Sequence, residues 1–285
     1  MHGDADTGRN WTRRDLGRAV AGAAILATVG GGAAAGAADD SPLAEFVRAL
    51  DPERRRALVL PADDPRRAMV QNHWAVVPGR IADLTAAQQE LALGLIRRAC
   101  SPDGFDRLTR ARLDDHGGWK HDHIAVFGDP ADPARAEWVV TGRHLTLRGA
   151  ADGIIAGGPL FLGHSAPVAD GAWRDAAGRA GMLWEALDTD QRGRAARAPG
   201  LDLGELAASG RGLARDLLWT LVDPFRAFAV PGVRAVLEPR ADWAGVRWEA
   251  YPDRAGVPRA WRLAGPGFRW SFHADPHAHA WFDAG

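Results

Sequence analysis

The chain has very little cysteine, lysine and tyrosine. Its 285 residues include one cysteine, Cys100, and one tyrosine, and Lys120 is the only lysine among 35 basic residues. A single cysteine cannot form an internal disulfide bond. A nucleophilic cysteine needs a neighbouring base, whereas Cys100 follows a helical run that offers it only two arginines. We therefore expect Cys100 to be a buried, unreactive thiol.

Long apolar runs and an excess of charge are also missing. Charged residues interrupt every candidate stretch in the body of the chain, and the formal net charge is −1. Because a transmembrane helix needs roughly 20 apolar residues, we expect no membrane span in the mature chain. Interspersed charges of both signs give no basic surface for nucleic acid or anionic lipid. We expect neither kind of partner.

The first forty residues have the pattern of a twin-arginine export signal. Arg13 and Arg14 precede the apolar stretch 19–29, and an A-x-A cleavage site follows at residues 35–37. The apolar stretch is too short to span a bilayer, so we expect a removable signal peptide over residues 1–37. The arginine pair predicts the twin-arginine export machinery as a partner. It also predicts a periplasmic or extracellular location.

The rest of the chain alternates between helical and strand patterns. Capping residues and apolar spacing predict helices from residue 41 and over residues 51–60, 84–99, 105–113, 174–197 and 210–222. Strand composition predicts strands over residues 121–128, 138–140, 144–147, 153–156, 246–251, 259–263 and 268–273. This order predicts an α+β fold in which helices pack around an antiparallel sheet built from a central and a C-terminal meander. We see no internal repeat and expect a single domain over residues 38–285.

Histidines are the main candidates for chemistry, because imidazole is the commonest metal ligand and the usual base near neutral pH. The chain has ten, and four of them form two His-x-His pairs, His121/His123 and His277/His279. On a strand, alternate side chains point to one face, so either pair can hold one ion. A bare His-x-His pair is nevertheless a weak signal, and structural histidines explain both pairs as well.

Two further histidines and one serine are weaker candidates. His144 lies in a predicted strand between the two pairs, and His164 follows Gly163 in a predicted turn. Ser165 comes next, but Pro167 replaces the second glycine of a nucleophile elbow, so a hydrolase serine is disfavoured. Three histidines with one open position are typical of catalytic zinc, whereas histidine with carboxylate suits iron, copper or manganese. The residues alone do not distinguish these sets of metal ligands.

The order of short motifs in the chain resembles that of a known bacterial family. The motifs are residues 50–54, 64–67, 74–78, 84–88, 124–128, 142–147, 159–163, 187–192 and 277–279. In this order they are similar to the bacterial "domain of unknown function 3500" family over nearly the whole mature length. The chain resembles a divergent member with a twin-arginine signal. The resemblance implies an exported protein with helices around a sheet, and it implies no reaction.

The resemblance also implies a choice among the histidines. The family's signatures are similar to Gly-His-His-Leu in a central strand and His-x-His near the end, and this chain keeps His144, His277 and His279. The other candidates fall where relatives carry aromatic residues or vary: His121, His123 and His164. Our leading hypothesis is therefore a metal-dependent enzyme in which His144, His277 and His279 bind one transition-metal ion, either zinc, iron or copper.

Three further residues are the candidates for catalysis on a small-molecule substrate. Arg143, which stands in place of the first histidine of Gly-His-His-Leu, would contact an anionic substrate oxygen. His273 or Asp283 would transfer a proton. Other departures from the family occur at Ser271, where an acidic residue is usual, and after His-x-His, where Arg-Asp is not reproduced. If these groups form an active site, the chain is an altered or inactive member.

A second hypothesis is a non-catalytic periplasmic protein that binds a small molecule in an aromatic cleft. Four tryptophans are its candidates: Trp74, Trp138, Trp270 and Trp281. Core packing explains most tryptophans as well. A third hypothesis is a degenerate homologue that keeps the fold and has lost its activity. Metal content and the orientation of the tryptophans distinguish the first two.

Overall fold

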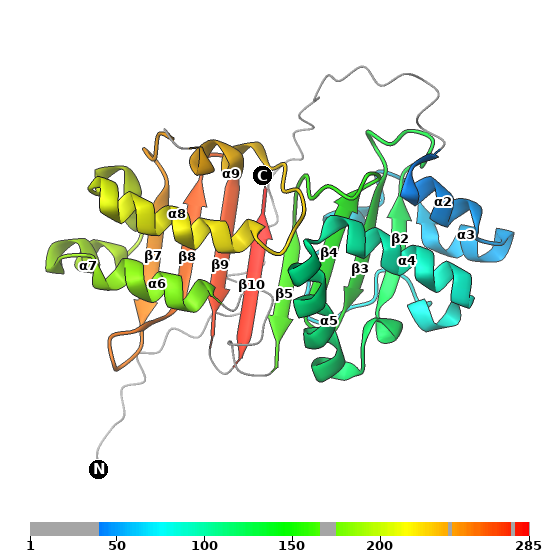
Figure 1. The fold of residues 1–285 in the computed structure, drawn as a ribbon, viewed down its shortest axis with the longest axis horizontal. Helices are drawn as coiled ribbons and strands as arrows, with labels where there is room; N and C mark the ends of the chain where they lie inside the picture. Colours follow the sequence, from blue (N-terminus) through cyan, green and yellow to red (C-terminus); the bar gives the residue numbers. More distant parts are fainter. Residues whose placement is uncertain (1–39, 166–174, 239–240, 275–276, 285) are drawn as a thin grey trace, which may run out of the picture.

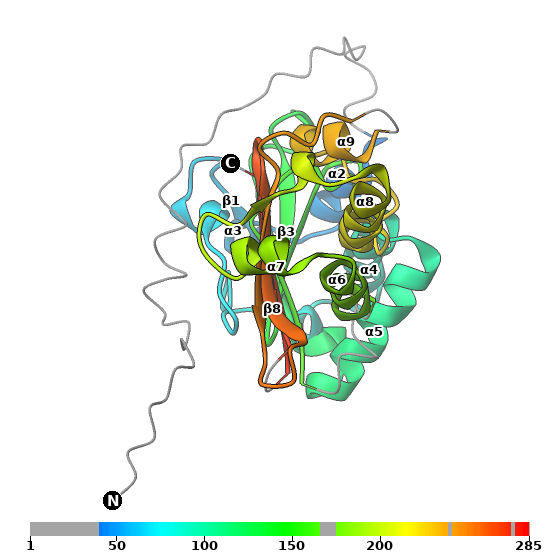
Figure 2. The same cartoon turned by 90° about the vertical axis from the view of Figure 1, so that its left-hand side faces the viewer.

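The computed structural model describes residues 40–165, 175–238, 241–274 and 277–284 of the chain. These residues form a ten-stranded sheet with most of the helices against one face (Figures 1 and 2). The predicted α+β class is therefore confirmed. Within these ranges, no helix has the length and apolar character that a membrane span requires. The predicted signal peptide, residues 1–37, lies outside them.

The first three helices begin where the capping residues predict, and the fourth begins three residues before its predicted start at residue 105. They are α2 (Pro42–Arg48), α3 (Pro52–Leu58), α4 (Ala86–Ala99) and α5 (Pro102–His116). Each follows a side chain that accepts a hydrogen bond from a backbone N–H of the first turn: Ser41, Asp51, Thr85 and Ser101. Such caps satisfy backbone donors that have no partner within the helix. The starts of these helices are thus decided by local chemistry.

A meander of four antiparallel strands follows the first helices. The strands are β2 (His123–Phe127), β3 (Glu137–Gly142), β4 (Leu145–Ala150) and β5 (Leu160–His164). A short strand, β1 (Val59–Leu60), lies parallel to β2 at the outer edge. The predicted helix through Leu60 is therefore wrong in its last two residues, because pairing with the buried strand β2 outweighs helix propensity there.

The second part of the chain repeats this order of elements. It contains α6 (Ala176–Glu185), α7 (Thr189–Ala195), β6 (Leu201–Asp202), α8 (Ala208–Val222) and α9 (Pro231–Leu237). A second meander follows: β7 (Arg247–Pro252), β8 (Pro258–Gly265), β9 (Phe268–His273) and β10 (Ala278–Asp283). Each half thus has two helices, a short strand, two more helices and a four-stranded meander. The sequence pattern shows no repeat, whereas the structure has one in its topology.

Local details support the repeat. In each half the first helix packs on the third, α2 on α4 and α6 on α8. A 3₁₀ turn precedes the third helix in both halves, η4 (Ile81–Asp83) before α4 and η7 (Leu203–Glu205) before α8. The second and third strands of each meander are joined by two residues, since Gly142 pairs with Leu145 and Gly265 pairs with Phe268. The two halves are therefore variants of one architecture.

The two halves meet at the centre of the sheet. The strand order is β1-β2-β3-β4-β5-β10-β9-β8-β7-β6, so the last strand of each meander pairs with the last strand of the other. β5 and β10 run antiparallel, with Gly163 opposite His279 and Phe161 opposite Trp281 (Figure 1). The order of strands reverses across this pair, so an approximate two-fold axis passes between β5 and β10. The predicted sheet of two meanders is confirmed.

The two halves differ in how the face opposite the helices is covered. In the first half, residues 61–80 lie over this face, where Trp74 Nε1 donates to Thr146 Oγ1 at 2.8 Å and the Val76 N–H donates to Thr141 Oγ1 at 2.9 Å. In the second half, β6 leads directly into η7. Consequently, no described segment of comparable length covers this face over β7–β10 (Figure 2).

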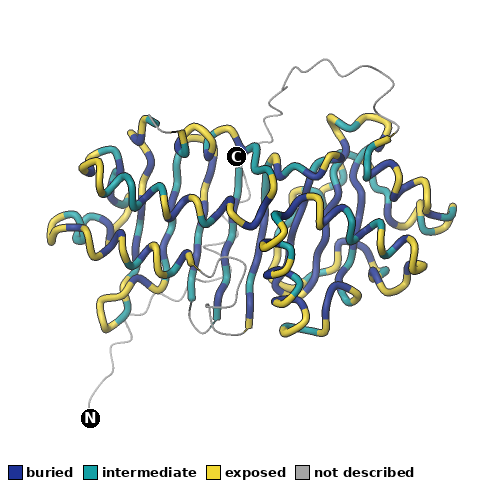
Figure 3. Tube along the Cα trace, viewed as in Figure 1, coloured by how far each residue is buried: buried dark blue, intermediate teal, exposed yellow. Residues whose placement is uncertain are grey.

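The core lies between the sheet and the helices (Figure 3). Its largest fully buried side chains are mainly aromatic and include Trp138, Trp248, Trp261 and Trp270. Cys100 is 0% exposed at the end of α4, and burial raises the pKa of its thiol to about 12. Since the thiolate is the reactive form, the expectation of a buried, unreactive cysteine agrees with its surroundings.

Three local predictions are wrong around the central strands. His144 lies in the turn between β3 and β4 rather than in a strand, and His164 ends β5 rather than lying in a turn. Residues 153–156 are not a strand, although Ile155 forms a single bridge with Phe228. Ile155 is 0% exposed, so the apolar composition of this segment reflects burial rather than strand pairing. β5, α9 and β10 are elements that the composition did not predict.

Candidate metal centre

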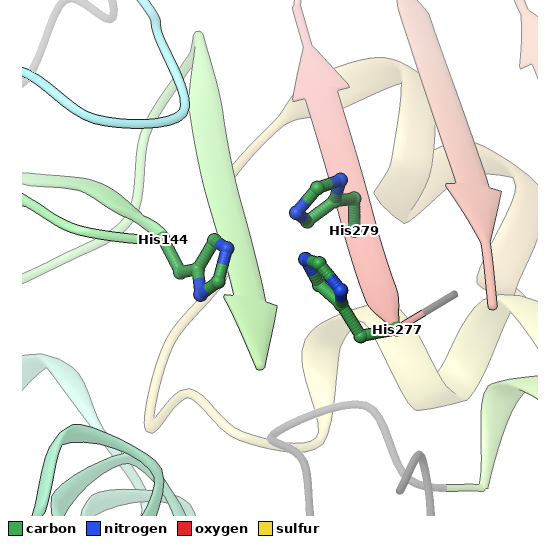
Figure 4. A group of neighbouring side chains, drawn as sticks. All are labelled: His144, His277 and His279. Carbon is green, nitrogen blue, oxygen red and sulfur yellow. The ribbon is translucent and has the colours of Figure 1, made fainter. Parts of the chain in front are cut away.

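Three histidines from the two halves meet at one end of the central strand pair (Figure 4). His144 comes from the turn between β3 and β4, and His277 and His279 come from the start of β10. One ring nitrogen from each can be chosen so that all three lie within 4.8 Å of one another. These residues are the three that the sequence and the family resemblance single out, and the structure brings them together.

The backbone of His144 has an unusual conformation for a residue with a side chain. Its φ is 55°, and no other described non-glycine residue has a positive φ. At the equivalent place in the second half, the turn between β8 and β9, Gly267 has a φ of 73°. Glycine adopts this conformation freely, whereas other residues do so at a cost in free energy. His144 adopts this backbone conformation at a cost in free energy, at a position that suits glycine. This indicates that the histidine has a role beyond folding.

A buried carboxylate orients the ring of His144. Asp115, near the end of α5, has a fully buried side chain, and its Oδ2 lies 2.5 Å from His144 Nδ1. Burial opposes the charge, but the hydrogen bonds from His144 and Ser165 outweigh it and hold the pKa of Asp115 well below its usual range. An ionised carboxylate only accepts hydrogen bonds. His144 Nδ1 therefore donates to Asp115, which leaves Nε2 as the nitrogen of this ring that could bind an ion.

His279 is a neutral ring with one unused nitrogen. Its Nδ1 lies 3.2 Å from His273 Nε2 on the neighbouring strand β9. Its Nε2 is buried and has no hydrogen-bond partner among the described residues. Burial, followed by the charges of the surrounding histidines, lowers the pKa of His279 to about 3. Burying a polar atom without a partner costs free energy, and a metal ion would satisfy this one.

His277 completes the group at its solvent side. It is partly exposed, and its ring centroid lies 5.0 Å from that of His144 and 4.6 Å from that of His279. Burial and the neighbouring charge of His144 lower its pKa. A neutral imidazole is the form that binds a metal ion. The site thus has two enclosed rings and one that reaches solvent.

Gly163 makes room for the histidines between β4 and β10. A Cβ atom at this position would lie 2.8 Å from His279 Cδ2, 3.0 Å from the Ala278 carbonyl oxygen and 3.2 Å from His144 Cβ. The first of these contacts is shorter than ordinary packing allows. The absence of a side chain on β5 therefore lets the rings of His144 and His279 approach each other across that strand.

The spacing of the nitrogens suits one ion after a small adjustment. Zinc binds histidine nitrogen at about 2.0–2.1 Å, so two nitrogens of a tetrahedral site lie about 3.4 Å apart. The present separations of up to 4.8 Å would have to shorten by up to about 1.4 Å to reach this value. Three protein ligands leave a fourth position open, which is the pattern of catalytic rather than structural zinc.

Arg143 and Ser165 lie beside this group. Arg143 Nη2 donates to Ser165 Oγ at 3.3 Å, and Arg143 Nε lies 3.9 Å from Asp115 Oδ1. The Arg143 side chain is 48% exposed. The buried Arg112 holds the turn from within, because it donates to the Arg143 carbonyl and pairs with Asp122 at 2.7 Å. The guanidinium of Arg143 is thus available to solvent at the edge of the histidine group.

The other two candidate catalytic residues lie differently. His273 contacts His279 directly, as described above. Asp283 lies on the same face of β10 as His279 but four residues further along, about 13 Å away at the rise of a strand. It is paired across the sheet with Arg269, and burial raises its pKa. The structure therefore brings His273 to the three histidines and places Asp283 at the far end of β10.

The remaining histidine candidates lie outside the group. His123 Nδ1 lies 2.9 Å from the Gly79 carbonyl oxygen, and the His121 ring lies 5.6 Å from the His116 ring. His164 is buried on β5, but it is paired with Ala278 and so points to the face of the sheet opposite to His279. This arrangement agrees with the choice that the resemblance implies.

The four candidate tryptophans lie in different environments. Trp138 and Trp270 are 0% exposed and belong to the core between sheet and helices, so they do not line an open cleft. Trp74 belongs to the covering segment, residues 61–80, and donates to Thr146 of the sheet. Trp281 lies on the uncovered face, with its ring centroid 5.5 Å from those of His273 and His279. Only Trp281 of the four lies both near the histidines and on that face.

Sequence reasoning missed two residues on which the site depends. Asp115 lies on a helix whose sequence contains several acidic residues, and nothing in the local pattern distinguishes it from the exposed ones. Gly163 stands out only as a glycine within an apolar strand, which often marks close approach of another group. That signal was present in the chain, although it does not say which group approaches.

The fold and site define an α+β protein with a three-histidine group that could hold a metal ion. Residues 40–195 match the model of a family described as "Protein of unknown function (DUF3500)". The match covers more than half of the chain, and the chain belongs to this family. The matched region includes the whole first meander with His144 and ends with the last residue of α7, so His277 and His279 lie beyond it. A search of the curated proteins and a search of the solved structures found no match.

Substitution of Gly163 by alanine tests whether this glycine sets the spacing of the histidines. The new Cβ would displace the His279 ring, and we expect Gly163→Ala to weaken zinc binding by about tenfold or more, or about 1.4 kcal/mol. The measurement is competition against a chelating dye. Gly157→Ala is the matched control, because no atom lies within 4 Å of a Cβ there. Equal affinity in the two variants would contradict this role of Gly163.

Substitution of Asp115 by asparagine tests the orientation of His144. The asparagine oxygen still accepts a hydrogen bond but carries no charge, and we expect Asp115→Asn to lower zinc affinity by about 10–100-fold, as for other carboxylates behind metal ligands. Asp106→Asn, an exposed change on the same helix, is the control for loss of charge. Thermal unfolding would establish that both variants are folded. An unchanged affinity in Asp115→Asn would refute the role.

Proposed function

We propose that this chain is a metal-dependent enzyme in which His144, His277 and His279 bind one transition-metal ion. The observation that carries the proposal is the convergence of three ring nitrogens, two from the second half of the chain and one from the first. The Asp115 carboxylate behind His144 and the unpartnered Nε2 of His279 support it. Among zinc, iron and copper, zinc agrees best with three imidazoles and no carboxylate ligand.

The openness of the site favours catalysis over a structural role. A structural zinc site is closed by four protein ligands, whereas this group offers three. His277 is partly exposed and Arg143 is 48% exposed at the same edge, so a substrate and water can reach the open position. An ion held by three neutral ligands keeps its full charge and supplies Lewis acidity and water activation. We therefore infer a hydrolytic or hydration reaction on a small molecule.

The residues around the three histidines have separate roles in this proposal. Arg143, steadied by Ser165, would bind an anionic oxygen of the substrate or of the transition state. His273, 3.2 Å from His279, would orient that ring and exchange a proton at the edge of the site. Asp283 is too far along β10 to contact the ion, and it would meet only a substrate that extends along the strand.

We further propose that the chain is exported through the twin-arginine route to the periplasm or the extracellular space. The support is the sequence pattern of residues 1–37, an arginine pair before a short apolar stretch and an A-x-A site. Export of a folded protein would allow the metal to be bound before translocation. The machinery of that route is the expected partner.

The export proposal predicts a strict dependence on the arginine pair. We expect the variant Arg13→Lys/Arg14→Lys, which keeps both charges, to remain in the cytoplasm as the full-length precursor. The parent should be exported with a new N-terminus at Ala38. Cell fractionation and intact-mass measurement in a host with the twin-arginine system check both. Export of the processed lysine variant would show that another route is used.

Metal analysis of the native protein is the decisive test of the metal centre. We expect about one equivalent of metal per chain in the parent and loss of that metal in His277→Ala/His279→Ala, because two of the three ligands are gone. The matched control is His121→Ala/His123→Ala, which removes the other His-x-His pair. Elemental analysis of protein recovered without added metal gives the readout.

Two outcomes would overturn the proposal. Absence of stoichiometric metal from the parent would leave a non-catalytic binding protein or an inactive homologue. Equal metal loss in the two double variants would show that binding is not specific to this group. Circular dichroism of each variant separates loss of the ion from loss of the fold.

A further inference from the structure

We propose that the uncovered face of β8, β9 and β10 beside the candidate metal centre binds a neutral, hydroxyl-rich ring, such as a sugar. This inference rests on the proposed function, because it names the substrate class of the same site. It starts from a small, shallow hollow that opens to solvent. Its side chains on the uncovered face are Ala260, Arg262, Ser271, His273 and Trp281.

The register of the strands explains why the face is hollowed there. Ser271 on β9 lies between Arg262 on β8 and Trp281 on β10, since cross-strand neighbours point to the same face. In the next row, His273 lies between Ala260 and His279. The small side chains of Ala260 and Ser271 form the floor, and larger side chains rise around them.

The hollow is continuous with the three histidines. Its two members nearest to the centre are His273, whose Nε2 lies 3.2 Å from His279 Nδ1, and Trp281, whose ring centroid lies 5.5 Å from that of His279. The Trp281 ring also packs against the Phe161 ring of β5, with the two ring centroids 4.8 Å apart. A ligand ring that packs on Trp281 would therefore have one edge beside the coordination position that the three histidines leave open.

The charges around the hollow are balanced, which favours a neutral ligand. Arg262 Nη1 lies 3.5 Å from Glu249 Oε1, and the Tyr251 hydroxyl also donates to Glu249. Because Glu249 balances the charge of Arg262, Arg262 offers hydrogen-bond donors but no net positive charge that would attract an anion. The Glu249 carboxylate offers acceptors beside them.

A sugar hydroxyl both donates and accepts hydrogen bonds, so paired donors and acceptors suit it. The Trp281 ring suits the apolar C–H face of a sugar, because an indole combines a flat apolar surface with a polar edge. The chemistry of the hollow thus matches a ring that is apolar on one face and rich in hydroxyl groups at its rim.

Titration with neutral methyl glycosides tests the proposal. The probes are the methyl glycosides of glucose, galactose and xylose, with benzoate as an anionic ring of similar size, and binding is measured by calorimetry. We expect saturable binding of at least one glycoside and none of benzoate. Trp281→Ala should weaken that binding by about tenfold or more, or about 1.4 kcal/mol. The control Trp219→Ala removes a 50% exposed tryptophan on α8, on the other face.

A second variant distinguishes a loss of glycoside binding from a loss of packing caused by Trp281→Ala. Ser271→Leu fills the floor of the hollow without removing a large side chain, and we expect it to block glycoside binding while the unfolding temperature stays close to that of the parent. The proposal is overturned if no glycoside binds, if benzoate binds instead, or if both variants bind like the parent.

The same titration on His277→Ala/His279→Ala separates the two proposals. Glycoside binding that persists in a variant without metal supports the hollow independently of the ion. Metal in the parent without glycoside binding would overturn the sugar-binding proposal but not the proposed metal centre. Glycoside binding in a parent without metal would support the sugar-binding proposal and overturn the proposed metal-dependent enzyme.

Discussion

The pairing of β5 with β10 is the constraint on which the rest of the structure depends. It joins two meanders into one sheet and sets Gly163 opposite His279. Because Gly163 has no side chain, His144 approaches from one side of β5 and His279 from the other. The first half holds His144 and Asp115, and the second holds His277 and His279. Neither half contains the whole group, so the central seam creates the site.

The two halves share an architecture, and the candidate functional features lie where they differ. The turn between the second and third strands contains Gly267 in one half and His144 in the other, both with positive φ. Residues 61–80 cover the sheet in the first half, whereas β6 leads directly into η7 in the second half, where no described segment of that length covers the sheet. One departure supplies a histidine of the group that could hold a metal ion, and the other lies beside the hollow at Trp281.

The electrostatics of the site are consistent with a metal ion. Asp115 stays ionised because its hydrogen bonds outweigh the cost of burial, and this fixes the proton of His144 on Nδ1. His279 stays neutral because its surroundings disfavour a charge, and its Nε2 has no other described partner. A divalent ion would be stabilised by three neutral rings and by the nearby carboxylate. The same neutral rings without an ion leave a buried polar atom unsatisfied, which is costly.

The sequence by itself determined the features that depend on few neighbouring residues. The caps at Ser41, Asp51 and Thr85 start helices locally, and alternating residues predict strands. The order of motifs indicated the family, and the resemblance singled out His144, His277 and His279. The tertiary structure alone decided the turn at His144, the partnership with Asp115, the role of Gly163 and the hollow beside Trp281. These features join residues far apart in the chain, and their contacts depend on strand register and on the order of strands at the central seam. A sequence pattern within one segment carries no information on either, so only the assembled sheet could place them.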